Sequence, residues 1–194
     1  MTASHDGSWA LWDLSEGRSL FHEEALAEVK TVYTAAEFHP DGLLLATARE
    51  QLSSACLRRI GVQLWDTLSQ QTVADLTGHT GAVNALAFSE NGYHMASGSD
   101  DGSVKLWDLR KVGDSFHTIA GSGAAVKAVK FDFSGRYLGT GCSEARVYDT
   151  QGKAFSVVKT FEDHSGAVTS VGFNGNATTL FSTSMDRSLK FYGN

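Results

Sequence analysis

A dipeptide of tryptophan and aspartate recurs along the chain at a nearly fixed interval. Its occurrences are Trp12-Asp13, Trp65-Asp66 and Trp107-Asp108, with a weaker echo at Tyr148-Asp149. The last three are separated by 42 and 41 residues. A unit that repeats at this length buries its apolar faces only against neighbouring copies of itself. The 194 residues are therefore expected to form one array of similar units.

Residues 78–118 show the pattern of one unit. A Gly-His pair opens it, and an apolar stretch at 82–88 predicts an inner strand. Turn residues then separate two further strands, predicted at 93–98 and 104–108. A fourth segment near 116–119 is expected to form the outer edge of the next unit. The Gly-His start, the Trp-Asp end and the period predict an all-β fold, a WD-repeat β-propeller.

The spacing divides the chain into five predicted units. They are residues 1–25, 26–75, 76–118, 119–160 and 161–194. Seven blades of this size need roughly 300 residues, so we expect a partial, open propeller of four to five blades. The sequence begins within a unit and stops after a third strand, so both ends are expected to expose unpaired strand groups.

One interval between the repeated Trp-Asp pairs is longer than the period. Trp12 and Trp65 are 53 residues apart, and the excess lies near residues 49–60, where Arg59 occupies a position that the pattern gives to Asp. A surface insertion, a retained intron read as protein and a short helix all fit this excess. Because long loops without structure are uncommon in compact domains, we favour a disordered or poorly packed loop.

Serine, histidine and aspartate recur together and suggest a hydrolase at first sight. The sets are His79, Ser97, Asp101 and Trp107; His164, Ser182, Asp186 and Tyr192; and, without a histidine, Thr2, Asp6 and Trp12. A set that repeats with the structural period predicts scaffolding: buried hydrogen-bond chains in which an orphaned group costs about 1–3 kcal/mol. Tyr192 in place of Trp is expected to weaken its set. The unit ending at Tyr148 lacks the histidine and aspartate, so we expect it to rely on packing.

Composition argues against several classes of function. The net charge is −6, and the longest basic cluster lies at 57–60, which argues against an extended nucleic-acid surface. No apolar run reaches a membrane span and no signal peptide opens the sequence, so an intracellular protein is expected. Cys56 and Cys142 are predicted to be reduced thiols. We expect no catalytic, cofactor or metal site.

Four strings are more specific than the general WD pattern. They are residues 38–42 (Phe-His-Pro-Asp-Gly), 88–93 (Phe-Ser-Glu-Asn-Gly-Tyr), 103–111 (Ser-Val-Lys-Leu-Trp-Asp-Leu-Arg-Lys) and 185–192 (Met-Asp-Arg-Ser-Leu-Lys-Phe-Tyr). In order and spacing the chain resembles the C-terminal half of the pre-mRNA-processing factor 19 family. The resemblance implies nuclear, spliceosomal ubiquitin ligases with an N-terminal U-box, a tetramer-forming coiled coil and a seven-bladed propeller. Neither a U-box nor a heptad segment is found in this sequence.

The resemblance implies a protein-interaction scaffold, the partner-binding arm of a splicing-associated ubiquitin ligase, with a link to mRNA splicing, ubiquitination and DNA repair. Its expected partners are splicing-complex subunits and ubiquitination substrates, with no direct nucleic acid, membrane or cofactor. Self-association is expected only through a coiled coil absent here. Two alternatives remain: a fragment of the ligase enzyme, and a WD scaffold of an unrelated intracellular complex.

Partner contacts are expected, by analogy with the fold, beside the loops that precede the inner strands and beside the turn aspartates. These candidate partner-binding residues are His5, Ala82, Asn84, Asp100, Lys127, Ala167, Thr169 and Met185.

Overall fold

The computed structural model describes residues 1–24, 30–52, 58–111, 113–121, 123–151 and 155–193. Within these ranges the chain forms eighteen strands in five antiparallel sheets and no helix. The first sheet contains β1 (Thr2–Ala3), β2 (Ser8–Asp13) and β3 (Arg18–Glu24). The second contains β4 (Lys30–Phe38), β5 (Leu44–Leu52), β6 (Arg58–Asp66) and β7 (Gln71–Thr77).

The remaining three sheets repeat the same up-and-down order. The third sheet contains β8 (Val83–Phe88), β9 (His94–Ser99), β10 (Ser103–Asp108) and β11 (His117–Ala120). The fourth contains β12 (Ala128–Phe131), β13 (Tyr137–Gly141), β14 (Ala145–Asp149) and β15 (Ser156–Phe161). The fifth contains β16 (Val168–Phe173), β17 (Thr179–Ser184) and β18 (Leu189–Gly193). The predicted all-β fold is confirmed.

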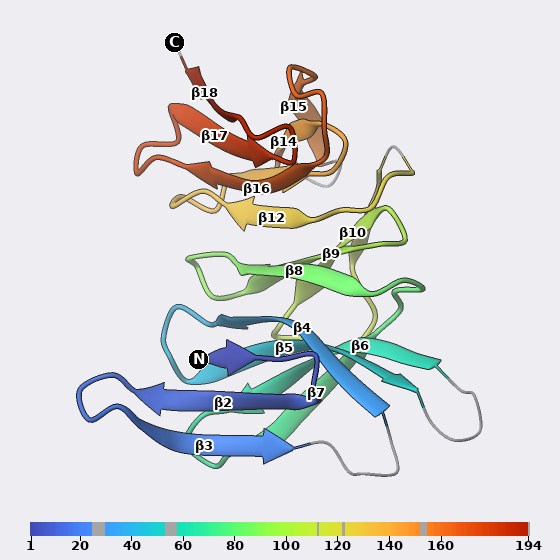
Figure 1. The fold of residues 1–194 in the computed structure, drawn as a ribbon. Helices are drawn as coiled ribbons and strands as arrows, with labels where there is room; N and C mark the ends of the chain where they lie inside the picture. Colours follow the sequence, from blue (N-terminus) through green and yellow to red (C-terminus); the bar gives the residue numbers. More distant parts are fainter. Residues whose placement is uncertain (25–29, 53–57, 112, 122, 152–154, 194) are drawn as a thin grey trace.

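The sheets stand side by side in chain order (Figure 1). The inner strands β4, β8, β12 and β16 are neighbours in that order. The first and fifth sheets lie at opposite ends of the row, so the five sheets form an open, partial propeller, as the sequence predicts.

The fourth strand of a unit was expected at the outer edge of the next unit, and this is wrong for the third sheet. Strand β11 pairs with β10 in register from Ser103 opposite Ala120 to Leu106 opposite His117. The short connection after β10 lets the chain reverse directly, which favours an antiparallel neighbour in the same sheet.

The predicted loop over residues 49–60 is also wrong for the part that the structure describes. Residues 49–52 extend β5 and residues 58–60 extend β6, with Glu50 opposite Ile60 and Leu52 opposite Arg58. The Arg58 guanidinium lies 2.6 Å from Glu50, so opposite charges face one another across the ladder. The excess residues therefore lengthen a hairpin. Residues 53–57 lie outside the described residues.

Neighbouring sheets interlock through a bulky residue of one and a small residue of the other. A Cβ added at Gly98 would lie 2.6 Å from Val126 Cγ1, and one at Gly141 would lie 2.8 Å from Val168 Cγ1. Both valines are fully buried, and full burial of a valine side chain stabilises a fold by about 1.5–3 kcal/mol. The apolar clusters therefore run between sheets, which explains why no unit buries its core alone.

Candidate functional site

The third sheet carries a continuous hydrogen-bond chain. Trp107 Nε1 donates to Ser97 Oγ over 2.8 Å. Ser97 Oγ lies 2.8 Å from His79 Nε2, and His79 Nδ1 lies 2.8 Å from Asp101 Oδ2. One set of proton positions satisfies every contact: Nδ1–H donates to Asp101 and the serine hydroxyl donates to Nε2. The chain joins the loop before β8 to the turn between β9 and β10, because Thr80 N–H also donates to Asp101.

The fifth sheet repeats this chain in a weaker form. His164 Nε2 lies 2.7 Å from Ser182 Oγ, and His164 Nδ1 lies 2.9 Å from Asp186 Oδ2. The phenol oxygen of Tyr192 is 3.4 Å from Ser182 Oγ, compared with 2.8 Å for the tryptophan nitrogen in the third sheet. The longer contact places a weaker bond at this end of the chain.

The first sheet holds only part of its set together. Trp12 Nε1 donates to Thr2 Oγ1 over 2.9 Å, but Trp12 is 43% exposed. Asp6 is not joined to this pair, since its carboxylate accepts from the backbone and hydroxyl of Ser8. These local bonds lower the pKa of Asp6.

A further pair escaped the sequence prediction. In the second sheet Trp65 Nε1 donates to Thr47 Oγ1 over 2.9 Å, and both residues are buried. The extended hairpin separates the two by 18 residues, so the usual spacing of ten is hidden. Alignment of residues 45–48 with 95–98 would have revealed the threonine.

The fourth sheet lacks the chain, as its sequence indicates. Thr140 and Tyr148 occupy the serine and tryptophan positions, and both are buried. The loop before β12 is bound to the third sheet by backbone bonds: Gly121 N–H donates to Gly102 O and Val126 N–H to Ser99 O, each over 2.9 Å.

The aspartates of the Trp-Asp pairs act at the opposite end of the sheets. Each accepts the backbone N–H two residues later and so closes the turn before the next strand. The donors are Ser15 for Asp13, Leu68 for Asp66, Arg110 for Asp108 and Gln151 for Asp149. Arg110 also pairs with Asp108 and lowers the pKa of that carboxyl to about 2.

The hydrogen bonds of the third sheet have the order of a hydrolytic triad, but here the serine is not accessible to solvent. Ser97 is 0% exposed, and Trp107 occupies a further site on its oxygen. Burial lowers the pKa of His79 despite the neighbouring carboxylate, so the imidazole is neutral at pH 7. Burial raises the pKa of Asp101, but bonds from Ser103, Thr80 and His79 outweigh it and hold the pKa well below its usual range. A substrate has no path to this serine.

We call the end of the sheets that carries His79 and Asp101 the loop face. Three candidate partner-binding residues meet there across the boundary between the third and fourth sheets. Asp100 Oδ1 accepts from Asn84 Nδ2 and from Lys127 Nζ, each over 2.7 Å. Asn84 also donates to Val126 O over 2.9 Å. The Lys127 ammonium and the Asn84 amide lower the pKa of Asp100. We call Asn84, Asp100 and Lys127 the loop-face cluster.

The other candidates are not part of this cluster of side chains, although Ala82 contacts it through its backbone. Ala82 O and Ala167 O accept from Asp100 N–H and Met185 N–H at equivalent places in two sheets. Thr169 Oγ1 lies 2.9 Å from Thr183 Oγ1. Met185 is 74% exposed, and His5 is exposed in the turn between β1 and β2. The fifth sheet therefore groups Ala167, Thr169 and Met185, whereas His5 belongs to the first sheet, which lies at the other end of the row (Figure 1).

The described residues contain no group of three or more His, Cys, Asp or Glu side chains placed to hold a metal ion. Cys142 is a buried thiol whose sulfur lies 3.4 Å from Glu144 O, and Cys56 lies outside the described residues. No helix in the described ranges has the length and apolar character to cross a membrane.

Two comparisons relate the chain to known proteins. Residues 70–108 and 155–193 match the family described as "WD domain, G-beta repeat". Pre-mRNA-processing factor 19 homolog 2 of Arabidopsis thaliana is 43% identical over 198 residues, covering 100% of this chain and 35% of the relative. Pre-mRNA-processing factor 19 of Oryza sativa subsp. japonica is 41% identical, covering 100% and 36%. The Homo sapiens protein of that name is 38% identical, covering 98% and 36%. The chain thus spans about a third of the length of these curated relatives.

Proposed function

Because the chain belongs to the pre-mRNA-processing factor 19 family, in the WD-repeat portion of its members, we propose that it is a non-catalytic scaffold that holds partner proteins in pre-mRNA processing. The loop-face cluster supports this role most directly. Asn84, Asp100 and Lys127 are fixed by mutual hydrogen bonds across two sheets, so a partner would meet ordered polar groups. Ordered groups reduce the conformational entropy that binding costs.

The finer proposal concerns the longer protein to which such a portion belongs. In that setting the array is the substrate- and partner-binding arm of a nuclear, splicing-associated ubiquitin ligase with a link to DNA repair. The resemblance of the four strings supports this assignment. The chemistry of ubiquitin transfer would belong to a U-box outside this sequence, and the buried Ser97 gives no reason to place catalysis within it.

Competition in a splicing extract tests the scaffold. An excess of the purified chain should lower the yield of spliced product from a reporter pre-mRNA, because it occupies partners needed by the endogenous complex. The double variant Asp100→Ala/Lys127→Ala should lose most of this inhibition. Its thermal unfolding midpoint, measured in parallel, should stay close to that of the parent chain.

A matched control removes an exposed ion pair from the opposite end of the sheets. Glu16, in the turn between β2 and β3, is paired with Arg18 at the start of β3, so Glu16→Ala/Arg18→Ala changes the same number of charges. This variant should inhibit splicing like the parent. If the parent chain has no effect at any concentration, the proposed function is wrong; if both double variants inhibit equally, the loop face is not the docking surface.

A further inference from the structure

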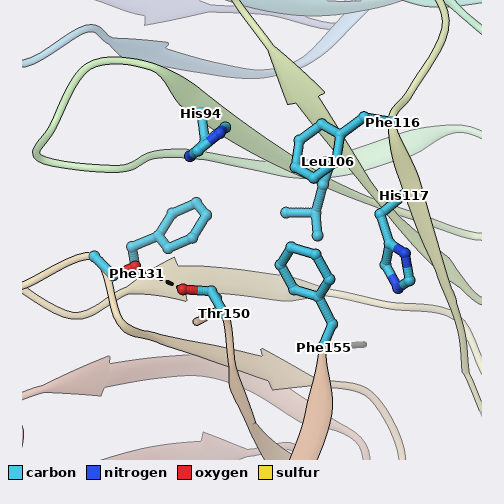
Figure 2. Close-up of a pocket in the computed structure, with 8 residues that line it drawn as sticks. His94, Leu106, Phe116, His117, Phe131, Thr150 and Phe155 are labelled. Carbon is cyan, nitrogen blue, oxygen red and sulfur yellow. Dashed lines mark hydrogen bonds between the residues drawn. The ribbon is translucent and has the colours of Figure 1, made fainter. Parts of the chain in front are cut away.

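A cavity of about 380 Å³ lies between the third and fourth sheets, at the end opposite the loop face. Figure 2 shows its walls, which come from both sheets. Strands β9, β10 and β11 and the residue before β11 contribute one side. The end of β12, the following turn and the residues flanking β14 and β15 contribute the other. Its volume falls within the range of small-ligand pockets in proteins, about 300–1,000 Å³.

Aromatic rings form most of the walls. Phe116 and Phe155 lie 5.9 Å apart between ring centroids at 51°, and Phe155 stacks on His117 at 4.5 Å and 26°. Leu106 and Phe131 are buried and close the floor. Because offset and tilted ring contacts are favourable at these separations, a further aromatic ring would gain such contacts here.

Two polar side chains, His94 and His117, line this apolar space, and among the described residues neither ring makes a hydrogen bond. Among the residues that the structure describes, no hydrogen bond reaches either ring nitrogen of His94, whose ring lies 5.3 Å from that of Phe116 (Figure 2). Burial lowers the pKa of His94, so the neutral ring offers one N–H donor and one nitrogen acceptor at pH 7. The Thr150 hydroxyl, by contrast, already donates to the carbonyls of Gly135 and Arg136.

The charges beside the cavity are already paired. Arg110 binds Asp108 at 2.8 Å and Arg136 binds Asp149 at 3.3 Å. A carboxylate or phosphate ligand would have to compete with these aspartates and leave its own solvation shell. The site therefore favours an uncharged group.

Exposed aromatic residues surround the cavity and point to an occupant larger than a metabolite. Tyr93 precedes the wall residue His94, Phe116 is itself a wall, and Phe133 lies in the turn that ends at Gly135; all three are more than 45% exposed. An exposed apolar patch beside a pocket is typical of a protein-binding surface. The patch would contact the residues that flank an anchor side chain.

We propose that this cavity receives a tyrosine side chain of a partner protein, with its ring among Phe116, Phe131 and Phe155 and its hydroxyl bonded to His94. This proposal rests on the proposed scaffold function, but the cavity is distinct from the loop face. Tyrosine fits better than phenylalanine because the phenol satisfies His94, and better than tryptophan because a phenol both donates and accepts.

Two small probes test the chemistry on the complete chain. 4-Ethylphenol and ethylbenzene differ only in the hydroxyl, and each is titrated while aromatic ¹H–¹³C resonances are followed by NMR. Saturable shifts should appear for Phe116, Phe131 and Phe155, and 4-ethylphenol should bind about 5-fold more tightly, the effect of one modest hydrogen bond. Equal affinities would overturn the role of His94, and the absence of saturable shifts at these rings would overturn the pocket.

Two variants that each keep an aromatic ring locate the hydrogen bond. His94→Phe should make the two affinities equal, whereas His117→Phe, which preserves the stack on Phe155, should leave the preference for the phenol intact. The reverse pattern would show that the bond is made elsewhere. Thermal unfolding midpoints close to the parent value ensure that neither result reflects loss of fold.

A capped peptide tests the protein source. Acetyl-Leu-Tyr-Leu-amide should bind about 10-fold more tightly than 4-ethylphenol, because its leucines contact the exposed rim. Phe133→Ser, at a residue 71% exposed, should reduce this advantage and leave phenol binding unchanged. Weaker binding of the peptide than of the phenol would overturn a protein occupant in favour of a free aromatic compound. Failure of splicing inhibition with peptide binding intact would count against the proposed function alone.

Discussion

The third and fourth sheets are neighbours of similar construction that are stabilised differently. Their central aromatic residues are equally buried, with Trp107 at 2% and Tyr148 at 3% exposure. Only the third sheet has the hydrogen-bond chain to His79 and Asp101. Because the fourth sheet forms without it, packing is sufficient for a sheet. The polar chain instead fixes the loop before β8 to the turn between β9 and β10.

The fourth sheet holds its corresponding loop by other means. Gly121 and Val126 donate backbone bonds to carbonyls of the third sheet. A Cβ at Gly121 would overlap the carbonyl oxygen of Gly102, so this loop begins with a glycine, as the loop before β8 does at Gly78. The loop before β12 is thus held in part by backbone bonds to the third sheet, without a histidine side chain.

The largest difference between the two sheets should follow loss of the indole. Trp107→Phe removes buried volume and the donor to Ser97, and we expect a loss of about 2–4 kcal/mol in the free energy of unfolding. Tyr148→Phe keeps the ring and should cost less than about 1 kcal/mol. Urea unfolding followed by circular dichroism measures both. Similar losses in the two variants would mean that the polar chain adds nothing to packing.

Loss of the serine at the centre of the hydrogen-bond chain should give the next largest loss of stability. Ser97→Ala leaves the Trp107 N–H and His79 Nε2 without partners, at a cost of about 1–3 kcal/mol. Ser182→Ala, in the fifth sheet with its longer contact to Tyr192, should cost roughly 1 kcal/mol. The same unfolding measurement compares them, and a greater loss for Ser182→Ala would contradict the order of strength inferred from the distances.

The dependence of stability on pH distinguishes the contribution of the histidine from that of the aspartates in these hydrogen-bond chains. The pKa of His79 in the folded protein lies below its ordinary value of 6.5, so the unfolded state binds its proton more readily. Its stabilising contribution is therefore complete above pH 6.5 and declines as the pH falls from 6.5 towards the lowered pKa. The thermal midpoint should drop between pH 7.5 and 5. His79→Gln should flatten this dependence, and an unchanged slope would show that other groups cause it.

Two carboxyls extend the same series to lower pH. The pKa values of Asp101 and Asp186 lie below the ordinary 3.8, through hydrogen bonds from Ser103, Ser188 and the two histidines. Their contribution is complete above pH 3.8 and is lost as the pH falls below it. A separate, steeper decline of the thermal midpoint is expected there.

The smallest effect on stability should come from the loop-face cluster. Asp100→Ala breaks a bond to Lys127 that is exposed on both sides, and exposed pairs contribute about 0–1 kcal/mol. We expect a change below about 0.5 kcal/mol, together with reduced splicing competition. A loss above about 1 kcal/mol would mean that the cluster supports the fold and that reduced binding reflects instability.

Period and spacing predicted much of this structure because they follow from local chemistry. Ser97 lies within β9, Asp101 in the following turn and Trp107 near the end of β10, and the ladder brings these fixed offsets together in space. The Thr47–Trp65 pair was missed because a lengthened hairpin changes the offset without changing the contact. The cavity could not be predicted, since Phe116, Phe131 and Phe155 come from separate segments whose mutual placement depends on how two sheets pack.

The interlock of small and bulky residues gives the array a direction. At the boundaries between the third and fourth and between the fourth and fifth sheets, a valine of the later sheet, Val126 or Val168, lies against a glycine of the earlier one, Gly98 or Gly141. The two faces of a sheet are therefore complementary head to tail and unlike each other, as in a heterologous assembly. A sheet inserted backwards would set valine against valine or glycine against glycine, with a clash or a void. The positions of small and bulky residues thus select one orientation of a sheet relative to its neighbours at these two boundaries.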